Sequence, residues 1–363
     1  MGNKIPNITK RLTDAGVVEI ILTTLVSVLL FFFSSFFGKD GDEDVSFRIL
    51  GVCVFSLPYL LSKILALLIW IFVAVRLVLQ CERLRLMPVR SKIQLVLIML
   101  LVASNSAFQL FDETMVALLC FLHALFKIGG MYGMRDTVVD CFKAFLFFLM
   151  AAIFRIEYFG LVLLYFFVLL FYRTYSLRVF FCSLLGMVMV AWMVFGVCFF
   201  FDITDILANH LAGIFNIRFM WVGFGWTDYM WWGIFCVVVF VARISMDSSS
   251  YRFDLQTRLN NTMFGLIFWF SLAMEMIYSG SFSKMMIIGG VLSLSSYFSM
   301  EESDFSNIMF IVLLSVVISL RTIVSINGEN PKFAMPRISI PEIKMPEFQM
   351  PDLPEIPKQW KFW

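Results

Sequence analysis

Four charged residues lie inside or at the edge of long apolar runs, where a charge is costly unless it has a partner or a function. Glu19 opens the first such run and Arg76 lies near the end of the second, at a similar expected depth. Lys63 lies near the expected outer end of the second span, and Glu275 lies at a similar depth near the outer end of the span 262–279. These residue types permit two ion pairs, Glu19 with Arg76 and Lys63 with Glu275. The alternative for each side chain is to extend separately to the membrane surface.

A second polar group lies in the long connection from Phe201 to Asp228, which we expect to be the longest on the outer side. Its candidates for acid–base catalysis on an external substrate are Asp202, Asp205, His210 and Arg218. Their spacing matches no motif with a known mechanism, so a structural role for them is the alternative. If any loop holds an external binding site, we expect it to be this one.

Known catalytic motifs are missing from the sequence. It has no P-loop, no G-x-G-x-x-G, no H-E-x-x-H and no G-x-S-x-G. The seven cysteines are scattered without a C-x-x-C pair, which favours small buried apolar side chains over disulfides or metal ligands. We therefore expect no metal and no cofactor, and a non-enzymatic role is favoured.

The composition indicates that lipid surrounds most of this chain. Of its 363 residues, 61% are hydrophobic and 15% are charged, whereas soluble domains have about 45–50% apolar and about 25% charged residues. The formal net charge of +2 gives no reason to expect a nucleic-acid partner. We expect an all-α fold, a polytopic transmembrane helix bundle, with the lipid bilayer as its first partner.

Continuous apolar runs of about 20 residues are long enough to cross the bilayer as helices. They predict about 10–11 spans and three parts of the chain: a segment at 1–16, a transmembrane domain at 17–321 and a tail at 322–363. The predicted spans are 17–37, 48–79, 92–106, 114–131, 138–154, 158–173, 179–201, 229–243, 262–279, 284–299 and 305–321.

Basic residues predict the orientation, because short cytoplasmic loops are enriched in Lys and Arg. Basic clusters precede the first span and occupy the segments 83–92, 173–178 and 243–258, which all fall on one side if the spans hold. That side is predicted to be the cytoplasm, with the N-terminus inside and the C-terminus outside. The acidic loop at 300–304 departs from this pattern.

The run 48–79 is too long for one straight crossing and too short for two. Counting about 20 residues back from Gln80 reaches Leu60, just after Pro58, which disrupts a helix. We therefore expect the second span to begin there and residues 48–57 to form an interfacial or re-entrant segment.

The tail carries a five-residue repeat, in which four prolines are each followed by apolar residues at the third and fifth places of the unit, and three further prolines follow at a spacing of three. The prolines are Pro331, Pro336, Pro341, Pro346, Pro351, Pro354 and Pro357. Regular prolines prevent a helix and favour an extended chain, and the apolar places then share one face. Addition to a partner's sheet is one physical possibility. A solvated or interfacial tail without a partner is the alternative.

Several polar anchors recur in the stretch 121–202, where an aspartate opens a span, two arginine-containing turn motifs follow and a glycine lies in the next span. They are Asp140, Phe171-Tyr172-Arg173, Ser176-Leu177-Arg178 and Gly186. This pattern resembles a family of uncharacterised multi-pass membrane proteins of Bacteroidota. The chain departs from that family at Phe142 and Lys143, at the acidic loop and in the tail. The resemblance implies a bacterial inner (cytoplasmic) membrane and carries no known activity.

Three functions remain open on these observations. The leading hypothesis is a component of a cell-envelope assembly, whose bundle anchors or conducts and whose periplasmic tail recruits another envelope protein. The second is an enzyme of polyprenyl-linked glycan assembly, such as a polymerase or glycosyltransferase, that uses His210 and Arg218. The third is a transporter built around Lys63 and Glu275.

Overall fold

The computed structural model describes most of the chain between residues 24 and 327. The described residues are 24–26, 28–29, 31, 45–50, 52–84, 86–87, 92–105, 108–131, 137–202, 204–215, 226–248, 254–300 and 304–327. The chain divides into two units, Met1–Lys332 and Phe333–Trp363. The segment 1–16, most of the predicted first span and the proline-repeat tail lie outside the described residues.

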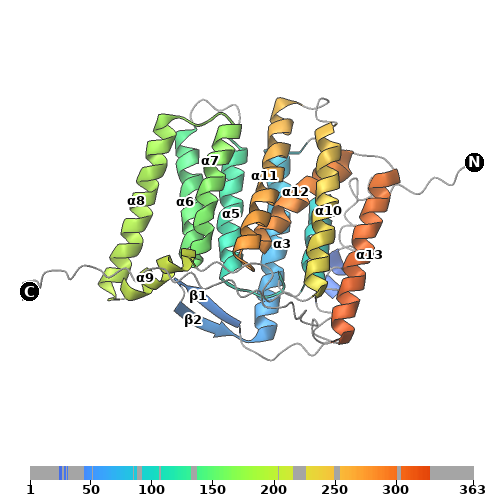
Figure 1. Ribbon diagram of the computed structural model, residues 1–363, viewed down its shortest axis with the longest axis horizontal. Helices are drawn as coiled ribbons and strands as arrows, with labels where there is room; N and C mark the ends of the chain where they lie inside the picture. The colour runs from blue at the N-terminus through green and yellow to red at the C-terminus, as the bar shows by residue number, and fades with distance from the viewer. Residues whose placement is uncertain are drawn as a thin grey trace, which may run out of the picture. The chain divides into compact units, whose positions relative to one another are not determined.

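Helices make up most of the described chain, and each predicted span from 48–79 onward overlaps a helix of the structure (Figure 1). The elements are β1 (Val45–Ile49), β2 (Val52–Leu57), α3 (Tyr59–Arg83), α4 (Ile93–Ser104), α5 (Glu113–Gly129), α6 (Val138–Phe154), η2 (Ile156–Gly160), α7 (Leu161–Phe171), α8 (Leu177–Phe200), α9 (Thr204–Ala212), η3 (Gly213–Phe215), α10 (Trp226–Ser248), α11 (Leu255–Ile277), α12 (Ser283–Met300) and α13 (Asp304–Asn327).

Three of the described helices are long and apolar enough to cross a membrane. They are α3, α8 and residues Tyr229–Ser248 of α10. Shorter apolar helices cover Ile93–Ser104, Ile156–Phe171 and Phe305–Ser319. The structure therefore supports a membrane protein.

Helix α8 shows an apolar surface that water would not tolerate. Only four of its residues are buried, and Leu177, Trp192 and Phe200 are 72%, 75% and 82% exposed. Soluble monomers rarely expose contiguous apolar surface of this extent. A helix that is apolar on every side and covered by protein on only one matches a lipid environment.

The expectation of a purely helical chain fails at residues 45–57, where β1 and β2 form an antiparallel hairpin. Polar and apolar residues alternate in β1, and this period of two suits a strand. Phe47 pairs with Phe55, and their rings stack with centroids 4.8 Å apart. Pro58 follows as the N-cap of α3. The predicted start of the helix after Pro58 is confirmed, and the preceding segment is the hairpin.

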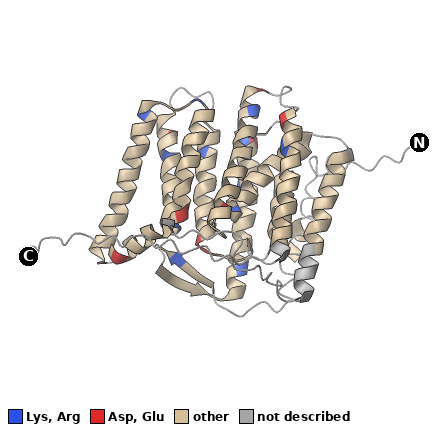
Figure 2. Ribbon diagram, in the orientation of Figure 1, with Lys and Arg blue, Asp and Glu red and all other residues tan. Residues whose placement is uncertain are grey.

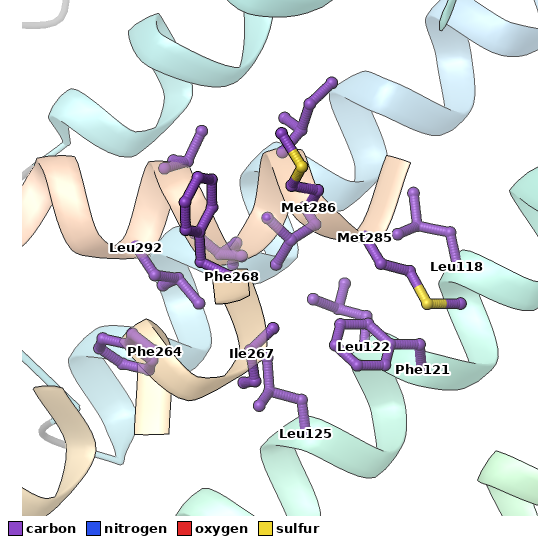
Figure 3. Close-up of a cluster of buried hydrophobic side chains, with 14 of the residues drawn as sticks. Leu118, Phe121, Leu122, Leu125, Phe264, Ile267, Phe268, Met285, Met286 and Leu292 are labelled. Carbon is purple, nitrogen blue, oxygen red and sulfur yellow. The ribbon is translucent and has the colours of Figure 1, made fainter. Parts of the chain in front are cut away.

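Helix α12 fills the centre of the described bundle. Residues 283–298 are all buried, and α12 contacts α11, α10, α4 and α5. Figure 3 shows side chains of α5, α11 and α12 meeting there, among them Leu122, Phe268 and Met286. A short helix with no polar stripe is therefore enclosed by its neighbours, as an interior helix requires.

Two adjacent glycines allow this close packing. A Cβ on Gly289 would lie 2.8 Å from the backbone nitrogen of Phe268, in α11. A Cβ on Gly290 would collide with the ring of Phe235, in α10. Small residues let helix backbones approach where side chains would hold them apart. At Gly289 the obstacle is backbone, which cannot rotate away.

Candidate functional site

Several connections between helices meet at one end of the bundle, which we call the hairpin end because β1 and β2 lie there beside α9 (Figure 1). Leu50 of the hairpin donates its N–H to the carbonyl of Ile153 at the end of α6, at 3.4 Å. The hydroxyl of Tyr278, after α11, donates to the carbonyl of Ile214 at 2.8 Å. The segments that join at this end are those predicted to lie on the outer side.

Glu275 stabilises the turn between α11 and α12. It is fully buried, and its two carboxylate oxygens accept the backbone N–H groups of Gly280 and Phe282, each at 2.7 Å. Gly280 has a φ of 83°, a conformation that favours glycine. This carboxylate therefore fixes the entry of α12 into the core.

Lys63 and Glu275, predicted as a pair, have other contacts in the structure. Lys63 is fully buried near the start of α3, and its ammonium lies 4.8 Å from the ring centroid of Tyr59. Glu275 uses both oxygens on backbone amides. Its role in the structure is that of a turn-forming acceptor.

We expect Glu275→Gln to destabilise the protein by about 1–3 kcal/mol, because glutamine has one oxygen and turns an NH₂ group toward the second N–H, leaving buried donors unpaired. Thermal unfolding of the purified protein in detergent, followed by tryptophan fluorescence, measures the loss. Glu82→Gln is the matched control, since Glu82 is exposed near the end of α3. Equal melting temperatures for both variants would contradict the role of Glu275.

Arg76 and His123 lie together in a pocket of the bundle. A pocket of about 250 Å³ between α3, α5 and α6 is lined by both residues and by Phe72 and Phe147. The rings of His123 and Phe147 have centroids 4.2 Å apart. The proposed partner of Arg76, Glu19, lies outside the described residues, so that pair stays a prediction.

A larger polar pocket of about 390 Å³ opens at the hairpin end. It lies between the hairpin, the start of α5, the turn from α6 to η2, and α9. Its lining residues are Arg48, Leu50, Val52, Glu113, Phe154, Arg155, Ile156, Glu157, Ile206, Asn209, His210 and Gly213. Its volume falls in the range of about 300–1,000 Å³ typical of small-molecule sites.

Arg155 forms an ion pair inside this pocket. Its Nε lies 3.5 Å from Glu157, and the two side chains are 28% and 18% exposed. Burial works against the charge of Arg155, but Glu157, Glu113 and other nearby groups outweigh it, so the pKa of Arg155 is raised above its usual value. The guanidinium is therefore permanently charged and has carboxylates close by.

The structure describes three of the four predicted catalytic candidates, and of these only His210 lines this pocket. His210 lines the pocket, and its Nε2 lies 3.2 Å from the carbonyl oxygen of Ala152. Because a carbonyl oxygen only accepts, Nε2 carries a proton there. Asp202 and Asp205 are exposed and do not line this pocket. Arg218 lies outside the described residues.

No protein-family model matches the chain, and no curated protein and no solved structure is significantly similar to it. The resemblance to the Bacteroidota membrane proteins therefore stays a prediction. Among the residues that the structure describes, no three His, Cys, Asp or Glu side chains are grouped so that they could hold a metal ion.

Arg48, Glu113, Arg155 and Glu157 join His210 in this pocket, and sequence reasoning missed all four. They were hidden because they lie in three segments far apart in sequence: Arg48 in β1, Glu113 at the start of α5, and Arg155 with Glu157 at the turn from α6 to η2. Their common signal is topological: in the predicted orientation all of them flank spans on the outer side. Grouping the charged residues of those connections would have indicated the site.

Proposed function

We propose that this protein is a polytopic component of a bacterial cell-envelope assembly, which its helix bundle anchors in the inner membrane. The observation that carries the proposal is the apolar surface of α8, where side chains from Leu177 to Phe201 are exposed along the whole helix. Lipid is the surrounding that such a surface favours. The remaining apolar helices pack beside it in one bundle (Figure 1).

The charge distribution supports an orientation with the N-terminus in the cytoplasm. Connections opposite the hairpin end carry Arg83, Arg173, Arg178 and Arg258, whereas at the hairpin end Arg48 and Arg155 are balanced by Glu113 and Glu157; basic and acidic residues are coloured in Figure 2. Basic connections favour the cytoplasmic side. The hairpin, α9 and the tail after α13 would then face the periplasm.

The packing of α12 favours an anchor over a channel. Residues 283–298 are buried in the middle of the bundle, and the glycines at 289 and 290 remove space between the helices. A conducting bundle needs polar, hydrated surface along its axis. The described centre is instead a packed apolar cluster (Figure 3).

Labelling from outside intact cells tests the orientation. In a Cys53→Ser background, we expect Asp205→Cys to react with a membrane-impermeant maleimide, because Asp205 is exposed in α9 at the hairpin end. Ser248→Cys, at the exposed end of α10, should react only after permeabilisation. The reverse pattern, or equal labelling of both positions before permeabilisation, would overturn the proposal.

The proline repeat supports the second half of the proposal, recruitment of an envelope protein by the tail. Truncation before Pro331 should abolish co-purification of that partner while the bundle remains in the membrane. A tail carrying Ile343→Ser and Phe348→Ser keeps its prolines but loses part of its apolar stripe, so it should also lose the partner. Unchanged co-purification with both variants would contradict recruitment by the tail.

One observation keeps the second function open, an enzyme of polyprenyl-linked glycan assembly. His210 lines a polar pocket together with Arg48 and Arg155, and these residue types suit acid–base catalysis on a phosphate-bearing substrate. A glycan defect in His210→Ala cells with an intact assembly would favour the enzyme. Normal glycan in those cells would favour the anchor.

A further inference from the structure

The pocket at the hairpin end lies between two elements with apolar outer surfaces. In β2, Val52, Val54 and Phe55 are 41%, 56% and 42% exposed. No residue of α9 is buried, and its Leu211 is 49% exposed. If the bundle spans a membrane, as proposed above, short amphipathic elements at its end lie at the level of the lipid headgroups.

Two charged residues of opposite sign in this pocket form no direct ion pair within the described residues, although Glu113 interacts electrostatically with Arg155. Arg48 and Glu113 both line it, and within the described part of the chain neither forms an ion pair or a side-chain hydrogen bond. Arg155 and Glu157 supply a second charge of each sign, which are already close to each other. The four side chains sum to zero charge.

This balance selects the class of ligand. A simple anion would gain the guanidinium of Arg48 but would meet the carboxylates of Glu113 and Glu157. A simple cation would be attracted by these carboxylates but repelled by the guanidinium groups of Arg48 and Arg155. A ligand with both charges offers a direct hydrogen-bond partner to Arg48 and to Glu113, because a guanidinium binds a phosphodiester through paired N–H groups and a carboxylate accepts from an ammonium.

The remaining walls of the pocket suit the apolar part of such a ligand. Leu50, Val52, Phe154, Ile156 and Ile206 line it beside the charged groups. A glycerol backbone and the first methylene groups of its acyl chains would be shielded from water by these side chains. A soluble zwitterion without acyl chains would not cover these apolar side chains.

We propose that this pocket binds a phospholipid whose headgroup carries a phosphodiester and a primary ammonium, as in phosphatidylethanolamine. Arg48 binds the phosphodiester and Glu113 accepts hydrogen bonds from the ammonium. The inference depends on the proposed membrane location and adds a specific lipid to it.

Native mass spectrometry of the detergent-purified full-length protein tests the assignment, with phosphatidylethanolamine, phosphatidylcholine and phosphatidylglycerol added in turn. We expect phosphatidylethanolamine to be retained several-fold better than the other two. Choline has no N–H to donate to Glu113, and phosphatidylglycerol has no cation. Equal retention of all three lipids would overturn the proposal.

Two variants separate the roles of the charged residues. Glu113→Gln should lower the retention of phosphatidylethanolamine to that of phosphatidylcholine and leave phosphatidylcholine unchanged. Arg48→Gln should weaken the retention of every phospholipid, because all share the phosphodiester. Arg178→Gln is the control, an exposed arginine at the start of α8, and should change neither. A uniform effect of all three variants would contradict the assignment.

Soluble glycerophosphoethanolamine distinguishes a lipid from a free metabolite. We expect it to displace the lipid only at far higher concentration, since it lacks acyl chains. Displacement at equal concentration would overturn the lipid assignment. A protein that stays monodisperse without detergent would refute the membrane location itself, whereas a detergent-dependent protein without lipid preference would refute only the pocket.

Discussion

Gly289→Ala is expected to destabilise the protein although alanine is the better helix former. In an exposed helix this substitution stabilises by about 0.5–1 kcal/mol. At Gly289 the new Cβ would lie 2.8 Å from the nitrogen and 2.9 Å from the Cα of Phe268, so α11 and α12 must separate. Overpacking of this kind costs about 1–3 kcal/mol. Thermal unfolding in detergent should show a melting temperature lowered by several degrees, and Gly289→Leu should prevent recovery of folded protein.

Gly196→Ala and Gly233→Ala are the matched controls for this prediction. Both glycines lie in helices, in α8 and α10, and a Cβ at either position meets no atom within 4 Å. We expect both variants to unfold at or slightly above the temperature of the unchanged protein. A lower melting temperature for Gly196→Ala, or an unchanged one for Gly289→Ala, would show that contact between the backbones is not the cause.

Asp112→Ala is expected to have the second large effect. Asp112 caps α5 by accepting the N–H of Met115 at 3.3 Å, and it forms an ion pair with Lys284 at the start of α12. The side chain of Lys284 is only 3% exposed, so loss of Asp112 leaves a buried ammonium with the more distant carbonyl of Leu110. Together these losses should cost about 3 kcal/mol, measured by the same unfolding experiment.

A double-mutant cycle isolates the ion pair from the cap. Lys284→Met should cost less than Asp112→Ala, because Asp112 is 32% exposed and water can solvate its carboxylate when the lysine is removed. In the double variant Asp112→Ala with Lys284→Met, we expect part of the loss to be recovered, since no buried charge remains unpaired. Additive losses would contradict a coupling between α5 and α12.

Hydrophobicity predicted the positions of the helices well, because a long apolar run can be recognised without knowledge of tertiary contacts. The predicted run 138–154 coincides with α6, and the helix starting beyond Pro58 is α3. Residues 48–57 were set apart from the following helix, but their strands were missed because the apolar residues of β2 do not alternate with polar ones. Its alternating partner, β1, was the available signal.

The candidate site was predictable only in part, because it is assembled from separate connections. His210 was identified by residue type and does line the pocket. Arg48 and Glu113 gave no signal, since a single charge beside a span is expected at any membrane surface. Glu275 was identified as an unusual buried charge, but its acceptance of backbone N–H groups depends on the turn at Gly280, which no spacing rule anticipates.

The central position of α12 has a consequence for how the protein is made. Synthesis proceeds from the N-terminus, so α4, α5, α10 and α11 are made before α12 emerges from the ribosome. These helices contact α12 in the finished bundle and cannot close around an absent neighbour. During synthesis the earlier helices must therefore stay loosely associated until α12, one of the last helices, arrives and completes the bundle.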